Sequence, residues 1–142
     1  MTFPGRPQIP TIDVGEAAAA AGADGTARSA AGAGPNEAAG ADGNGVPLLV
    51  DVRERNEFIE VRAPGAVLYP TSSFLLRFDE LPRDRPLHVI CNSGSRSAAV
   101  TAWLLRNGWS DVHNVAGGMV AWARAGHTVR RGPLDPGEGD LA

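Results

Sequence analysis

The only cysteine of the chain, Cys91, lies where the sequence pattern changes abruptly. Residues 87–90 are mostly apolar and partly β-branched, which predicts a buried strand. A short polar loop rich in Gly and Ser follows, and residues 97–107 have the spacing of a helix with one apolar face. Backbone N–H groups in such a loop, together with the positive end of a helix dipole, form an anion site. The pattern therefore predicts a Cys91 thiolate held between a strand and a helix.

The Cys91 thiol needs several donors if it is to ionise at neutral pH. A free cysteine has a pKa of about 8.5, and lowering it by two units requires about 2.7 kcal/mol. A helix terminus supplies about 0.3 to 1 kcal/mol, and up to about 2 kcal/mol when partly buried. Loop N–H groups, three serine hydroxyls or a guanidinium must therefore contribute. The candidate site comprises Cys91 as the nucleophile and, for binding, Asn92, Ser93, Gly94, Ser95, Arg96 and Ser97.

Four ordered segments resemble rhodanese-family sulfurtransferases. The loop Cys91-Asn92-Ser93-Gly94-Ser95-Arg96-Ser97 is similar to the active-site loop of stand-alone, single-domain members. The other segments are Leu49-Val50-Asp51-Val52-Arg53 with Glu57-Phe58, Pro64-Gly65-Ala66, and residues 114–122. The resemblance runs from Val46 to Gly132, with a weaker match over residues 9–21.

One segment departs from the family pattern. Val61-Arg62 stands where members usually carry Gly-His. We expect a structural substitution with a local change of packing here; added positive charge from Arg62 near the rim of the site is the less favoured alternative.

The resemblance implies a thiosulfate sulfurtransferase. In that scheme the Cys91 thiolate takes the outer sulfur of a donor such as thiosulfate and becomes a persulfide. The sulfur then passes to cyanide, a thiol or an acceptor protein. Arg96 would either face the anionic donor or brace the loop. Because there is no second cysteine, an external acceptor must enter to release the sulfur. The scheme uses no cofactor and no metal.

Two alternatives stay open. Phosphatases and arsenate reductases of the related fold also place Cys and Arg around an anion, but they carry five residues between the two. Four residues lie between Cys91 and Arg96, which favours the smaller sulfur atom. A catalytically silent binding or regulatory module is the other alternative, although such relatives often lack the cysteine. Cys91 could also be an inert buried residue, because free cysteine is among the most buried residue types.

The pattern of apolar segments predicts an α/β fold. We expect one rhodanese-like domain over residues 9–132, with a central parallel sheet of about five strands and helices on both faces. Residues 1–8 and 133–142 read as tails, the second without regular order. Between Gly15 and Gly45, 21 of 31 residues are Ala or Gly, which predicts a flexible insertion over residues 22–45.

Asp51 and Arg53 end another apolar run, residues 47–52. In parallel α/β sheets, ligand sites lie beyond the carboxyl ends of strands, so these residues and Cys91 should share one rim. They could support the Cys91 loop directly. Equally, they could hold the neighbouring loop together through Glu54, Glu57 or loop amides.

Local patterns suggest how the remaining segments are built. Thr71 or Ser72 should begin a helix that Pro82 ends. The paired Gly117-Gly118 indicates a close backbone approach or a positive φ.

Composition excludes several classes of function. The net charge of −3 argues against general nucleic-acid binding, and all 13 basic residues are Arg, so Lys-based Schiff-base chemistry is excluded. One Cys and three scattered His residues offer no zinc-ligand spacing. No apolar run is long enough to span a bilayer, and no secretory signal is visible at Met1 to Pro10. We therefore expect no membrane association and a cytoplasmic location, where the thiol stays reduced.

Overall fold

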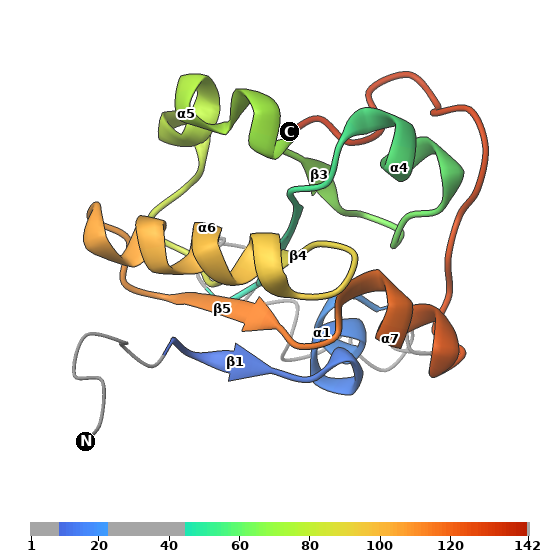
Figure 1. Ribbon diagram of the computed structural model, residues 1–142, viewed down its shortest axis with the longest axis horizontal. Coiled ribbons are helices and arrows are strands. Elements are labelled where there is room, and N and C mark those ends of the chain that lie inside the picture. The colour runs from blue at the N-terminus through green and yellow to red at the C-terminus, as the bar shows by residue number, and fades with distance from the viewer. Residues whose placement is uncertain (1–8, 23–44, 142) are drawn as a thin grey trace.

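The computed structural model describes residues 9–22 and 45–141. Within these residues five strands form one parallel sheet in the order β1-β5-β4-β2-β3 (Figure 1). The strands are β1 (Thr11–Ile12), β2 (Leu48–Asp51), β3 (Val67–Leu68), β4 (Leu87–Ile90) and β5 (Val112–Val115). The predicted α/β fold with a parallel sheet of about five strands is confirmed. The predicted tail 1–8 and all but the ends of the predicted insertion 22–45 lie outside the described residues.

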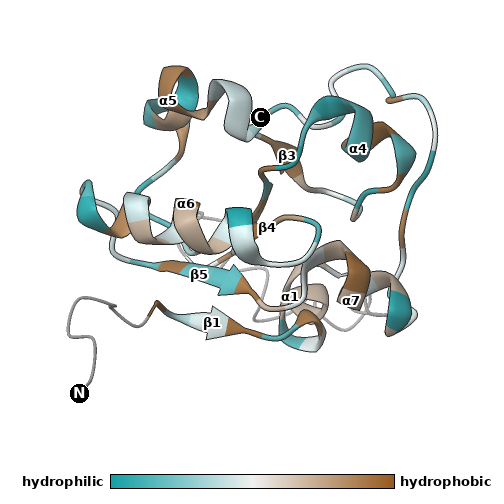
Figure 2. Ribbon diagram, viewed as in Figure 1, coloured by the Kyte–Doolittle hydropathy of each residue, from teal (hydrophilic) through white to brown (hydrophobic). Residues whose placement is uncertain are grey.

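Helices cover both faces of the sheet, as predicted. Helices α5 and α6 pack on one face, and α1, α4 and α7 pack on the other. Figure 2 shows hydrophobic residues along β3. The helices are α1 (Val14–Ala21), α4 (Arg55–Glu60), α5 (Phe74–Arg77), α6 (Ser95–Arg106) and α7 (Gly118–Arg124). Among the described residues, no helix is both long and apolar enough to cross a membrane.

Side chains along β4 point alternately to the two faces of the sheet and so contribute to two separate halves of the core. Val89 packs with α6 and Ile90 with α7, and both are fully buried. Successive side chains of a strand point to opposite faces, so a strand covered on both faces reads as a continuous apolar run. Each such side chain contributes about 1.5 to 3 kcal/mol when buried. The end of β4, where Cys91 follows, is therefore fixed from both faces.

The predicted continuous helix after Thr71 is broken into three pieces. A 3₁₀ turn, η1 (Thr71–Ser73), precedes α5, and a second one, η2 (Phe78–Glu80), follows it. Phe74 and Phe78 pack in the core against Trp103. Leu75 is 67% exposed, however, so the segment lacks the continuous buried stripe that stabilises a longer helix.

Arg62 has a structural position, in agreement with the favoured interpretation of this segment, and does not present a free charge at the rim of the site. Its side chain is buried and forms an ion pair with Glu138 at 2.6 Å. Its guanidinium also donates to the carbonyl oxygen of Gly132 over 2.8 Å. The departure from the family pattern at Val61-Arg62 therefore has a structural role, because Arg62 binds the C-terminal segment.

The predicted lack of order in the C-terminal tail is wrong for residues 133–141. Leu134 and Leu141 pack against the two halves of the core. The N–H of Leu68 on β3 donates to the carbonyl oxygen of Gly139 over 2.7 Å. The segment contains no helix or strand, but it is bound to the domain by side chains and backbone.

Replacing Arg62 with Ala should lower the free energy of unfolding by about 3 kcal/mol, because Glu138 and buried carbonyl groups would lose their partner. Urea denaturation measures the loss. The control is Arg130→Ala: its exposed guanidinium pairs with Asp135 over 2.9 Å and more weakly with Glu138 over 3.6 Å, and these pairs should contribute less than about 1 kcal/mol. Equal losses for the two variants would contradict the role assigned to Arg62.

Candidate functional site

Cys91 follows β4 directly and is fully buried. Strand β4 pairs with β2 in parallel, and Ile90 lies beside Asp51 in the register of the two strands. The ends of β2 and β4 therefore share one edge of the sheet, as the sequence predicted. Figure 1 shows the loop after β4 lying next to the start of α7.

Three hydrogen-bond donors converge on the sulfur of Cys91. The N–H of Gly94 lies 3.1 Å from Sγ, and the N–H of Ser97 lies 3.3 Å from it. The hydroxyl of Ser97 is also 3.3 Å from Sγ. Within the described residues, the hydroxyls of Ser93 and Ser95 make no hydrogen bond to the sulfur. The predicted anion site is thus made mainly of backbone, with one side chain.

These donors lower the pKa of the Cys91 thiol. Burial by itself raises the pKa, because it disfavours the charged form. The hydroxyl and N–H of Ser97, with the backbone N–H groups of Gly94 and Ser93, outweigh burial, and the net pKa lies below its ordinary value. The donors therefore stabilise the charged form of the sulfur more than burial disfavours it.

The loop is shorter than the sequence suggested, because α6 begins at Ser95 instead of Ser97. Gly94 precedes the helix with φ of 110°, a conformation that glycine adopts without steric cost. Ser95 and Arg96 consequently belong to the first helical turn. This tight turn directs the N–H groups of Gly94 and Ser97 toward the same atom.

Arg96 forms an ion pair with Glu57 of α4. Its two terminal nitrogens lie 2.9 and 3.0 Å from the two carboxylate oxygens. The hydrogen bond from Arg96 is the main cause that holds the pKa of Glu57 at about 2, and it also raises the pKa of Arg96. Of the two predicted orientations of Arg96, the structure shows the one that braces the loop. The sequence did not connect Glu57 with Arg96, although Glu57 stands in one of the segments that resemble the family.

Asp51 and Arg53 form a buried ion pair of their own. Arg53 Nη2 lies 2.8 Å from Asp51 Oδ2 and donates to the carbonyl oxygen of Val61 over 2.7 Å. Arg53 also donates to the carbonyl oxygen of Glu57. Within the described residues, neither side chain forms a hydrogen bond to the Cys91 loop. The pair contacts the segment that carries Glu57, which agrees with the second alternative raised by the sequence.

The start of α7 fixes the carbonyl side of the Cys91 loop. The N–H of Met119 donates to the carbonyl oxygen of Cys91 over 2.8 Å, and the N–H of Val120 donates to that of Asn92 over 3.0 Å. A Cβ on Gly118 would lie 2.3 Å from the carbonyl oxygen of Cys91. The close approach predicted from Gly117-Gly118 is confirmed.

Asn114 on β5 is a buried polar residue that sequence reasoning did not single out. Its Oδ1 lies 2.6 Å from the hydroxyl of Ser97. The same hydroxyl also lies 3.2 Å from the carbonyl oxygen of Gly94. A hydroxyl carries one proton, so Ser97 donates to only one of Asn114, Cys91 and Gly94 at one time. The only local signal was a polar side chain in an otherwise buried strand.

Comparison with known proteins decides the family. Residues 35–125 match the Rhodanese-like domain family. Over 79 residues the chain is 39% identical to a protein named Sulfurtransferase from Allochromatium vinosum. The aligned region covers 56% of this chain and 74% of that protein. The chain belongs to the rhodanese-like domain family.

Solved structures share the fold of this rhodanese-like domain. A rhodanese-related protein from Thermoplasma volcanium is similar with a TM-score of 0.64 and 25% identity, over 85% of this chain and 97% of that one. A rhodanese-like domain protein from Staphylococcus aureus is similar with a TM-score of 0.52 and 32% identity, over 58% and 80% of the two chains. The resemblance inferred from the sequence is confirmed.

Replacing Ser97 with Ala should raise the pKa of the Cys91 thiol, because the Ser97 hydroxyl is one of the groups that lower it. The thiolate forms as the pH rises, so its appearance should move to higher pH. Ultraviolet absorbance of the thiolate during a pH titration measures this. Ser95→Ala removes a hydroxyl that does not reach the sulfur and should leave the pKa unchanged; equal shifts would contradict the assignment.

Replacing Gly118 with Ala should lower the free energy of unfolding by about 3 kcal/mol or more, since its Cβ would collide with the backbone of Cys91 and Asn92. Gly126→Ala is the control. Gly126 also has a positive φ, of 83°, but nothing lies within 4 Å of its Cβ position. It should lose only about 1 to 2 kcal/mol from backbone strain. Denaturant unfolding compares the two variants, and similar losses would show that the close approach is unimportant.

Proposed function

We propose that this rhodanese-like domain is a sulfurtransferase that carries a sulfane sulfur on Cys91. The supporting observation is the convergence of the Gly94 and Ser97 N–H groups and the Ser97 hydroxyl on Cys91 Sγ. Such donors stabilise an anion without reorganisation, because the backbone already holds them in place. The similarity to a protein named Sulfurtransferase supports the same activity.

In the first half-reaction the Cys91 thiolate attacks the outer sulfur of thiosulfate. A bond forms between Sγ and that sulfur, and the sulfur–sulfur bond of thiosulfate breaks. Sulfite leaves with the bonding electron pair, so no oxidant, cofactor or metal enters the balance. The resulting persulfide is again an anion and occupies the same group of donors.

We assign binding of the donor and of the persulfide to residues of the Cys91 loop. Its residues Asn92, Ser93, Gly94, Ser95, Arg96 and Ser97 follow the nucleophile directly. Arg96 supplies positive charge close to Cys91, while Glu57 fixes its position. Asp51 and Arg53 act indirectly, by holding the backbone at Glu57 and Val61.

Asn114 sets the direction of the Ser97 proton in this proposal. If the side-chain amide of Asn114 flips, so that its oxygen and nitrogen exchange places, its N–H₂ group donates to Ser97 Oγ. The single Ser97 proton is then free to donate to Cys91 Sγ. Asn114 is thus a positioning residue that favours the charged form of the sulfur.

In the second half-reaction an acceptor thiolate or cyanide attacks the outer sulfur of the persulfide. The bond between that sulfur and Cys91 Sγ breaks, and its electron pair restores the Cys91 thiolate. Because the chain has no other cysteine, the acceptor comes from outside. We place this chemistry in a reducing compartment such as the cytoplasm, where thiol acceptors are abundant.

Incubating the protein with thiosulfate, without reductant, should add one sulfur atom, about 32 Da, to the intact mass. Cyanide or a small thiol should remove it, and Cys91→Ser should never acquire it. A low-pKa thiol that gains no sulfur from thiosulfate would contradict this donor and favour the phosphatase alternative. An unreactive thiol of ordinary pKa would favour the binding-module alternative.

A further inference from the structure

An open groove of about 460 Å³ lies beside the Cys91 loop. Ser93 of the loop stands at one end of its lining, and the rest comes from α7 and the residues flanking it. The lining residues are Ser93, Gly117, Val120, Ala121, Arg124 and Ala125. The N–H of Val120, another lining residue, donates to the carbonyl oxygen of Asn92 over 3.0 Å, so this end of the groove adjoins the Cys91 loop.

One stripe of α7 forms the wall of the groove. The lining residues Gly117, Val120, Ala121 and Arg124 are spaced by three or four positions, which places them on one side of a helix. The opposite side of α7 is buried in the core through Met119 and Trp122. Val120 is 46% exposed although it is apolar. The groove therefore presents an apolar wall that nothing in the described part of the chain covers.

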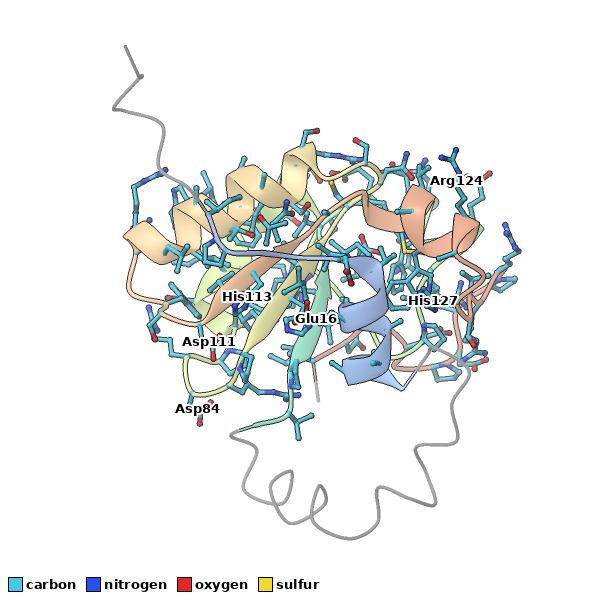
Figure 3. All side chains as sticks on the ribbon, turned by 90° about the horizontal axis from the view of Figure 1, so that it is seen from below. Glu16, Asp84, Asp111, His113, Arg124 and His127 are labelled. Carbon is cyan, nitrogen blue, oxygen red and sulfur yellow. The ribbon has the colours of Figure 1, made fainter. Side chains whose placement is uncertain are left out.

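Arg124 ends this wall with a positive charge. Figure 2 shows α7 changing from hydrophobic along its body to hydrophilic at its C-terminal end, and Figure 3 labels Arg124 there, at the margin of the domain. Its side chain is exposed and has no ion pair or hydrogen bond within the described residues. Arg53, Arg62 and Arg96, by contrast, are each held by a carboxylate. Arg124 is thus available to an external anion.

We propose that this groove binds the acceptor of the second half-reaction, and that the acceptor is a small thiol carrying a carboxylate. The inference rests on the proposed sulfurtransferase function and adds the chemical class of the acceptor. Val120 and Ala121 would contact a methylene chain, Arg124 would pair with the carboxylate, and the thiol would lie at the Ser93 end. Arg124 is a specificity-determining residue in this arrangement and does not touch the reacting sulfurs.

The length of the wall limits the acceptor. Seven helical positions separate Gly117 from Arg124, which corresponds to about 10 Å along the axis. The long Arg side chain can shorten this distance by turning back along the helix. A thiol and a carboxylate separated by several methylene groups fit the span, whereas thiols with an adjacent carboxylate are too short to use both ends.

Bonds and electrons balance in this sulfur transfer as they do in the second half-reaction above. The acceptor thiolate forms a bond to the outer sulfur of the Cys91 persulfide, and the bond from that sulfur to Cys91 Sγ breaks. Cys91 leaves as the thiolate, and the product is the persulfide of the carboxylate-bearing thiol. The Arg124 ion pair only raises the occupancy of the groove.

The test compares mercaptohexanoate with mercaptohexanol as acceptors from the Cys91 persulfide, followed by intact mass over time. The native protein should favour the carboxylate. Arg124→Gln should lower kcat/KM for mercaptohexanoate about two- to fivefold, the size expected for an exposed ion pair, and leave mercaptohexanol unchanged. Added salt should reduce the native preference, because it screens exposed charges.

Arg106→Gln is the matched control. Arg106 is also exposed and also lies in the last turn of its helix, so the substitution removes the same charge from an equivalent position. It lies at the end of α6 remote from Cys91 and should change neither rate. Equal rates for the two thiols in the native protein, or equal effects of Arg124→Gln and Arg106→Gln, would overturn the proposal.

Binding without catalysis separates this inference from the proposed function. Hexanoate should shift the amide NMR signals of Ser93 and Val120 in the native protein more than hexanol does, and Arg124→Gln should abolish the difference. One outcome is that thiosulfate adds no sulfur to Cys91 while hexanoate still shifts these signals more than hexanol does. In that case the donor assignment is wrong and the carboxylate site in the groove is supported. If Cys91 loads normally and hexanoate shows no preference, the groove assignment alone is wrong.

Discussion

The hydrogen bonds from Gly94 and Ser97 to Cys91 Sγ impose the main constraint on this structure. A sulfur that is buried loses water as a partner for its charged form, so the protein must supply donors in its place. Backbone N–H groups can do so only if the chain turns tightly around the sulfur. This requirement explains the glycine of positive φ at Gly94 and the immediate start of α6 at Ser95.

A loop that turns its N–H groups inward turns its carbonyl groups outward, where they also need partners. The start of α7 meets this need, because the N–H groups of Met119 and Val120 donate to the carbonyl oxygens of Cys91 and Asn92. The first N–H groups of a helix have no partner within the helix, so this arrangement satisfies both elements together. Gly118 is required because any side chain would occupy the space of the Cys91 loop.

Features set by nearby residues could be predicted from the sequence, and features set by distant residues could not. The strand before Cys91 and the Gly/Ser loop are local patterns. Glu57 lies 39 residues before its partner Arg96, and no local rule connects them. The C-terminal segment was expected to lack order because its own composition is polar. Its order comes from Arg62, whose partner Glu138 lies 76 residues away. The helix start was placed two residues late because Ser95 and Arg96 are polar and continue the pattern of the loop, whereas Gly94 is the residue that precedes the helix.

The charges around Cys91 explain why backbone N–H groups must provide most of the electrostatic stabilisation of an anion. Asp51 is neutralised by Arg53, and Glu57 by Arg96. When Cys91 ionises, these groups together carry one net negative charge, so side-chain charges alone would repel an anionic donor. Oriented N–H dipoles attract an anion without adding a charge that a carboxylate could neutralise. The same balance gives Arg124 its importance, because it is a positive charge beside the site that no carboxylate of the described chain compensates.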